Sequence, residues 1–397
     1  MSLGDTEGPV DINLPNLQLG DAKEQLALLF TPANRPRIRS INVGLAAYGA
    51  PTLLAPFLTG DFPRLQTLTV DCREPQWYEV DQEDADLHSS TVTVRRLEIQ
   101  HAPELTRAVL NNCLLPWTAN VFSQLTHLEI RVNGGDNFIA DDLLPTHQQL
   151  QTVITSMVAL EELYLDIFPE YDDVNQEQPP IALSPSCQQI TLRGRDAFLN
   201  RHCYRLAASL VVPPHAKLIV KQASTDDADL IVNHFAGPQH PPQALSLRTG
   251  LDLEHTSMGE VIIPFDPALW LATPANLLTA TPGGHISLQF LFDFGEDGEG
   301  EDEENCYNSL FRALSRIDYG QLRVVRIAGL REEQDIERLL FGGENDGDLE
   351  EVNVLSGAAN LDVLVATFDD DDLGQQFLDV VAAPGQPMFP LLQTVHQ

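Results

Sequence analysis

The sequence is poor in the features that would place a protein outside the cell or in a membrane. Only five cysteines occur among 397 residues, and no two of them have the C-x-x-C spacing of a metal or redox motif. There is no Asn-x-Ser/Thr sequon, no apolar stretch as long as the ~18 residues of a membrane span, and no signal-peptide pattern at the N-terminus. We therefore expect a cytoplasmic or nuclear protein with reduced thiols.

Basic residues are also scarce. The chain has 23 Lys and Arg against 58 Asp and Glu, which gives a formal charge of −35. Nucleic acids and anionic membranes are bound through clusters of cations, so we expect neither of them as a partner. A chain of this charge attracts a basic protein partner, although an acidic surface also simply keeps a protein soluble.

Motifs for catalysis and metal binding are missing as well. The eleven histidines form no H-E-x-x-H, and the chain has no G-x-S-x-G, no glycine-rich phosphate loop and no kinase signature. The acidic run at 295–305 lacks the ligand spacing of an EF-hand loop. We predict a protein that is not an enzyme, with no catalytic residue, cofactor or metal. A hydrolase whose Ser, His and acid meet only in the fold is the open alternative.

What the sequence does contain is a repeated apolar pattern. Residues 62–70, FPRLQTLTV, place apolar residues at i, i+3 and i+5, and similar segments recur along the chain. Most copies follow each other at nearly the 20–29-residue period of leucine-rich repeats, and longer intervals indicate insertions. With the i+3 residue as marker, the copies lie at Ile41, Leu68, Leu97, Leu128, Leu163, Ile190, Leu218, Leu245, Leu288, Val325, Val352 and Val395.

Each copy predicts a strand with one apolar side, because its apolar residues alternate with polar ones. One such unit can bury that side only against its neighbours, so we expect successive copies to pair in one sheet. Apolar spacing between the copies predicts short helices, including 21–30, 104–115, 143–157 and 373–381.

The fold class predicted from these patterns is α/β. Its finer form is an irregular leucine-rich-repeat solenoid, a horseshoe with a parallel sheet on the concave side and short helices on the convex side. An ordinary α/β sheet is the alternative, but it does not require the same spacing in every copy.

The predicted solenoid covers residues 9–397 as a single domain after a flexible N-terminus at 1–8. Acidic insertions interrupt it at 71–91, 168–180 and 295–305. The first insertion holds Trp77 and Tyr78, which either anchor a partner or fold back over the end of the sheet. The segment VIIPF, near Val261, predicts an extra strand at an edge of the sheet.

The candidate binding residues lie on the strand side opposite to the apolar one. In the middle of the chain this side carries a local basic group within an acidic molecule, and solenoids bind partners on their concave faces. Arg and Tyr are also frequent at binding hot spots. The predicted partner-binding residues are Arg131, Tyr164, Arg193, Lys217, Lys221 and Arg248, with incidental surface as the alternative.

Several segments carry a family resemblance: GPVDINL at 8–14, RPRIRSINV at 35–43 and LEELYLDIFP at 160–169. The order of strand, helix, proline pair and strand from Ile190 to Val220 belongs with them. In these segments the chain resembles the leucine-rich region of F-box-like proteins from mushroom-forming fungi. The resemblance implies a leucine-rich-repeat fold and a role in substrate recognition for a ubiquitin ligase.

In that family an N-terminal F-box docks on the Skp1 adaptor of a cullin ubiquitin ligase, and the repeats select the substrate. No F-box segment is visible before residue 9, so the resemblance implies Skp1 binding only if an F-box exists outside this chain. The expected function is therefore recognition of a protein partner, whose identity the sequence does not give. A structural or signalling leucine-rich-repeat protein unrelated to ubiquitination is the alternative.

Overall fold

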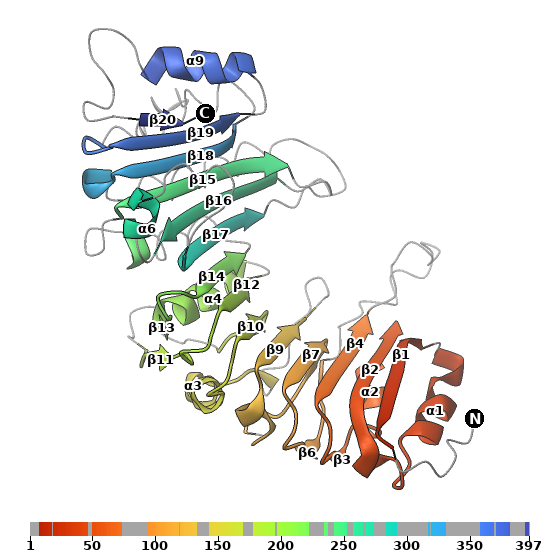
Figure 1. Ribbon diagram of the computed structural model, residues 1–397. Helices are drawn as coiled ribbons and strands as arrows, with labels where there is room; N and C mark the ends of the chain where they lie inside the picture. Colours follow the sequence, from red (N-terminus) through yellow and green to blue (C-terminus); the bar gives the residue numbers. More distant parts are fainter. Residues whose placement is uncertain are drawn as a thin grey trace. The chain divides into compact units, whose positions relative to one another are not determined.

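The computed structural model shows an α/β fold with mostly parallel strands (Figure 1). The chain divides into two compact units, the first holding residues 1–189 and 209–211 and the second holding 190–208 and 212–397. The structure describes residues 8–17, 19–46, 50–73, 94–118, 120–132, 143–169, 178–194, 197–221, 234–236, 242–251, 257–264, 267–272, 283–291, 317, 319–330, 358–368, 371–381 and 394–396.

The first unit is built on parallel strands that lie side by side in chain order (Figure 1). These strands are β1 (Val10–Leu17), β2 (Ile38–Ala46), β4 (Thr67–Arg73), β7 (Arg107–Asn111), β9 (His127–Arg131) and β10 (Glu162–Leu165). Their register aligns one apolar row, every member of which is at most 2% exposed: Ile12, Ile41, Leu68, Ala108, Leu128 and Leu163. The predicted alignment of Ile41, Leu68, Leu128 and Leu163 is confirmed.

The same turn precedes most of these strands. The backbone N–H of Leu65 donates to the carbonyl of Phe62 at 3.0 Å, and both side chains are buried. Equivalent bonds join Leu105 to Ala102, Leu125 to Phe122, Leu160 to Met157 and Cys187 to Ser184. The segment FPRL at 62–65 is therefore one copy of a structural repeat as well as a sequence repeat.

Short elements connect the strands of the first unit. Helices are α1 (Leu19–Leu29), η1 (Arg35–Arg37), α2 (Ala50–Leu54), η4 (Asn120–Gln124) and α3 (His147–Ser156). Small parallel pairs join β3 (Gly60–Asp61) to β6 (Ile99–His101), β5 (Arg95–Arg96) to β8 (Cys113–Leu114), and β11 (Ile181–Ala182) to β13 (Leu210–Val211). Thr146 and Gln149 form a capping box that fixes where α3 begins.

Two predictions for the first unit are wrong. Residues 104–115 form β7 and β8 instead of a helix, because Ala108 and Leu110 complete the buried face between β4 and β9. At Asn112 φ is 55°, which ends the strand. The predicted copy at Leu97 does not enter the main sheet either. It precedes β6, which pairs with β3, so the place after Leu68 belongs to Ala108.

The second unit contains β12 (Gln189–Arg193) from Ile190 onward, β14 (Lys217–Lys221), β17 (His285–Leu291), β16 (Ser257–Pro264), β15 (Ala244–Leu251), β18 (Val324–Leu330), β19 (Val363–Phe368) and β20 (Thr394–His396), in this spatial order. Strand β16 is antiparallel to both of its neighbours. The aligned row of Leu245, Val325 and Val395 is confirmed, with Leu364 between the last two.

The strand order of the second unit differs from the prediction. Leu218 lies opposite Ile286 of β17 and not beside Leu245. The residue aligned with Leu218 on β17 is therefore Ile286, two positions before the predicted marker Leu288. The strand expected at an edge, β16, lies between β15 and β17. Because β16 reverses the chain direction, the returning strand β17 takes the place beside β14. Val352 lies outside the described residues.

Helices cover both faces of the sheet in the second unit. Helix α6 (Pro267–Ala272) packs Trp270, which is 0% exposed, against a cluster of Ala244, Ile262, Val324 and Val365. Helix α9 (Asp371–Val381) lies on the opposite face, where Phe377 contacts Phe368 at a centroid distance of 5.1 Å. Helix α4 (Ala197–Ser209) connects β12 to β13. Ser246 and Ser287, on the α6 face, are only 1% exposed.

The helices expected over 21–30, 143–157 and 373–381 are confirmed as α1, α3 and α9. Most of the insertions at 71–91 and 168–180, all of 295–305, and both Trp77 and Tyr78 lie outside the described residues. Whether the two units continue one another as a single array stays a prediction.

Candidate functional site

The polar face of the first unit lies opposite its apolar row. Side chains alternate between the two faces of a strand, so the register that aligns the apolar residues also aligns polar ones. We define the polar face by three rows, Asp11-Ser40-Thr67-Arg107-His127-Glu162, Asn13-Asn42-Thr69-Val109-Glu129-Tyr164 and Gly44-Asp71-Asn111-Arg131.

Cross-strand hydrogen bonds join neighbouring strands on this face. Such pairs contribute roughly 0.2–1 kcal/mol each to sheet stability and hold the side chains in fixed positions. They are Asn42 Nδ2 to Asn13 Oδ1 (2.8 Å), Thr67 Oγ1 to Ser40 Oγ (2.7 Å) and Asn111 Nδ2 to Asp71 Oδ1 (2.7 Å). The polar face is therefore an ordered surface before any partner arrives.

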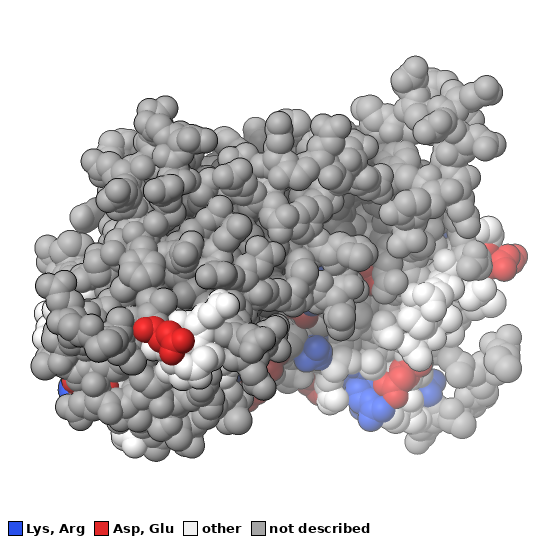
Figure 2. Space-filling view, turned by 90° about the horizontal axis from the view of Figure 1, so that it is seen from above, with Lys and Arg blue, Asp and Glu red and all other residues white. Residues whose placement is uncertain are grey.

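Charges of the two signs lie together on the surface. Figure 2 shows basic and acidic side chains beside one another in places, and acidic side chains alone elsewhere. One such pair is Arg39 with Asp11, where Arg39 Nη2 lies 2.5 Å from Asp11 Oδ2, and this contact lowers the pKa of Asp11. On this part of the surface a basic side chain is thus paired with an acidic one.

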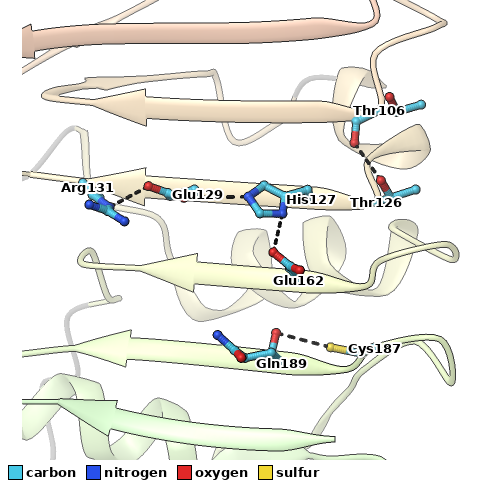
Figure 3. A network of polar contacts seen from close by, with 8 residues as sticks. All are labelled: Thr106, Thr126, His127, Glu129, Arg131, Glu162, Cys187 and Gln189. Atoms are coloured by element: carbon cyan, nitrogen blue, oxygen red, sulfur yellow. Dashed lines mark hydrogen bonds and ion pairs between the residues drawn. The ribbon is translucent and has the colours of Figure 1, made fainter.

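A polar cluster of the first unit lies on β9 and β10 (Figure 3). The His127 ring sits between two carboxylates, with Nδ1 2.7 Å from Glu162 Oε2 and Nε2 3.7 Å from Glu129 Oε2. The side chains of His127 and Glu129 are only 15% and 16% exposed, whereas that of Glu162 is 56% exposed. The His127 ring therefore lies between an exposed carboxylate, that of Glu162, and a mostly covered one, that of Glu129.

Arg131 and Tyr164, both predicted as binding residues, meet in the same cluster. Arg131 Nε lies 2.6 Å from Glu129 Oε1, and its guanidinium lies 4.8 Å from the centroid of the Tyr164 ring. This is the geometry of an ion pair combined with a cation–π contact. The charge of Arg131 is therefore already engaged within the protein, which the sequence prediction did not foresee.

The surroundings of Glu129 keep it ionised. Its polar contact with the His127 ring is the main cause that lowers the pKa of Glu129 below its ordinary value. Partial burial opposes this shift, and the charges of Arg131 and Arg107 add to it. Glu129 is therefore the carboxylate of the cluster that responds to one arginine on β9 and one on β7.

The other predicted binding residues belong to the second unit. Lys217 and Lys221 lie on β14, next to β12 with Arg193, and the N–H of Gly194 donates to the carbonyl of Lys221 at 3.2 Å. Arg248 lies on β15, which β17 and β16 separate from β14, and its side chain is outside the described residues. The structure thus brings Arg131 to Tyr164, and the strands of Arg193, Lys217 and Lys221 together, but not the strand of Arg248.

Sequence reasoning missed His127, Glu129, Glu162 and Arg107 as members of the site. The first three were visible as the outward residues of LTHLEIR and LEELYL, at matching places in two copies. Arg107 was hidden because its strand was read as a helix.

Among the described residues, no three His, Cys, Asp or Glu side chains are placed to hold a metal ion. In the same part of the chain, no helix has the length and apolar character needed to cross a membrane. No protein-family model, curated protein or solved structure matches this chain.

Proposed function

We propose that this chain is a non-enzymatic scaffold that binds a partner protein through the polar face of the first unit. The observation that carries the proposal is the contrast between the two units. Parallel sheets are usually covered on both faces, and in the second unit α6 covers part of one face while α9 packs against β19 on the other. In the first unit, by contrast, Arg107, Arg131 and Glu162 on the polar face are exposed. An ordered and accessible sheet face is a surface suited to a partner.

We also propose that the repeat is a leucine-rich repeat and that its strands form part of a solenoid. The repeated turn before each strand and the aligned buried row support this proposal. So does the segment LTRAVLNNCLL at 105–115, which fits the pattern L-x-x-L-x-L-x-x-N/C-x-L with Ala108 in place of one leucine. Solenoids of this kind bind partners on an exposed sheet face.

The sequence resemblance extends the proposal to the substrate-recognition region of an F-box-type ubiquitin-ligase receptor. A structural or signalling repeat protein unrelated to ubiquitination is the competing role. Cys72, Cys113 and Cys187 are buried free thiols, which supports a reducing compartment for either role.

The test is affinity capture with the wild-type protein and two variants. Thr69→Arg places a long cation in the middle of the polar face, where Thr69 is half-buried between β2 and β7. Thr152→Arg, on an exposed site of α3, is the control with the same change in size and charge. We expect a partner that the wild type and Thr152→Arg retain and that Thr69→Arg loses.

Binding would then be repeated with the purified partner, where Thr69→Arg should weaken the affinity about tenfold or more. Equal affinities of Thr69→Arg and Thr152→Arg would refute the polar face as the binding surface. The half-life of the captured partner in cells separates the two roles. A longer half-life on depletion of this protein supports substrate recognition, and an unchanged one favours the structural or signalling role.

A further inference from the structure

We infer that the β9–β10 part of the polar face takes an extended segment of the partner that is rich in arginine or lysine. This inference rests on the proposed function and adds the chemistry of the partner. The central residues are Glu162, Glu129 and Tyr164, with Arg131 and His127 as their internal neighbours.

Charge complementarity is the first argument. Residues 132–192, which include all of α3 and β10, hold ten Asp and Glu and no Lys or Arg. The whole chain, including this segment, carries a formal charge of −35. A field of this sign draws cationic segments toward the surface and repels acidic ones.

The contacts of Arg131 provide the second argument, because they show how this surface holds a guanidinium. A carboxylate oxygen of Glu129 lies 2.6 Å from Arg131 Nε, and the Tyr164 ring stacks against the same group at 4.8 Å. Arginine is well suited to such sites because its planar group pairs with carboxylates and stacks on rings at once. An arginine from a partner needs the same two kinds of neighbour.

Glu162 offers the carboxylate for that second cation. Its side chain is 56% exposed, and the contact with His127 uses one oxygen, Oε2. A carboxylate has about four acceptor sites on its two oxygens, so it can accept a cation from solvent while it keeps the histidine. Arg131 is less available to an acidic partner, because it is already paired with Glu129.

The test measures binding of a dye-labelled peptide of alternating arginine and serine by fluorescence anisotropy. Two further peptides replace each arginine by citrulline, which removes the charge at nearly the same shape, or by glutamate. Proteins are the wild type, Glu162→Gln, Glu162→Lys and Arg131→Gln. Glu24→Gln and Glu24→Lys, on an exposed position of α1, are controls for the change in net charge.

We expect the arginine peptide to bind and the citrulline and glutamate peptides to bind far more weakly. Glu162→Gln should weaken binding about threefold and Glu162→Lys about tenfold, while both Glu24 variants stay within about 1.5-fold of the wild type. Arg131→Gln should bind about threefold more tightly, because it removes the internal cation that pairs with Glu129.

Equal losses in the Glu162 and Glu24 variants would overturn the inference, since they would indicate attraction by net charge alone. So would weaker binding by Arg131→Gln, or a preference for the glutamate peptide. The proposed function is judged separately by the captured partner. If Thr69→Arg loses that partner while Glu162→Lys retains it, the polar face binds a protein but the cationic segment is wrong.

Discussion

Asn112 offers a sharp test of how the strands of the first unit are held together. It follows β7 with φ at 55°, a left-handed conformation that few residues other than glycine adopt. Its side chain is 1% exposed, and Nδ2 donates to the carbonyl of Cys72 at 2.6 Å. Its N–H donates to the carbonyl of Arg131 at 2.8 Å. One residue thus links β4, β7 and the end of β9.

Two substitutions separate the side-chain bond from the backbone strain. Asn112→Ala leaves a buried carbonyl without this donor, at a cost of about 1–3 kcal/mol, and adds about 1 kcal/mol because alanine tolerates the left-handed region less well than asparagine. Asn112→Gly loses the same hydrogen bond but adopts φ 55° freely. We therefore expect the free energy of unfolding to fall by about 2–4 kcal/mol in Asn112→Ala and by about 1 kcal/mol less in Asn112→Gly.

The assay is urea unfolding combined with amide hydrogen exchange across residues 107–131, so that the stability of the first unit is measured separately. The expected order of stability is Asn, then Gly, then Ala. If Asn112→Ala were as stable as Asn112→Gly, the strain argument would fail. If both were within about 0.5 kcal/mol of the wild type, the hydrogen bond to Cys72 would carry no net stability.

Three further predictions concern other described residues. Gly44→Ala should destabilise β1 by about 1–3 kcal/mol, because the new Cβ would lie 2.0 Å from the Pro15 carbonyl oxygen. Gly20→Ala, whose Cβ meets nothing within 4 Å, is the control and should not destabilise β1. Equal rates of amide hydrogen exchange in β1 of the two variants would contradict this. The lowered pKa of Glu129 contributes stability that is complete above its ordinary value of 4.5 and is lost as pH falls toward the folded-state pKa. Glu129→Gln should remove that part of the pH dependence when the free energy of unfolding is measured at a series of pH values. Burial raises the pKa of Cys187 to about 11, so at pH 8 a thiol reagent should label it slowly in the folded protein and fast in urea, and fast labelling without urea would refute its burial.

The aligned strands of the first unit could be predicted because their signal is local. In FPRLQTLTV the turn, the apolar positions and the alternation lie within nine residues, and the copy LTHLEI repeats them. The strand β7 could not be found with a leucine marker, since Ala108 fills that position. The full repeat pattern, closed by Cys113, was the signal that would have found it.

The order of strands in the second unit depends on contacts between distant segments. Nothing in the sequence near Leu218 says that Ile286 will lie opposite it. The consecutive apolar residues Val261, Ile262 and Ile263 did carry information, because a strand at an edge with one wet face would alternate. All three are at most 5% exposed, as a strand between two others and under a helix requires.

For the candidate site, the sequence predicts which side chains share a face better than it predicts which charges pair with each other. Arg131 and Tyr164 were placed on one face because they occupy outward positions of neighbouring copies, and the register brings them together. That Arg131 is already paired with Glu129 depends on side-chain conformations, which an alternating pattern does not determine. Partner binding by the predicted basic group stays a prediction, and the charge of Arg131 in it is already paired with Glu129.

The composition of the polar rows explains why the two units offer different surfaces. In the first unit the central row runs through Asn42, Thr69 and Glu129, side chains that can stay in water at no desolvation cost. The corresponding row of the second unit runs through Ile262 and Val365, which must be covered, and Trp270 covers them. In the first unit the exposed positions of this face thus include Arg131, whose charge is paired with Glu129. A partner cation that binds there leaves this pair in place and uses the exposed carboxylate of Glu162, because Arg131 already occupies Glu129.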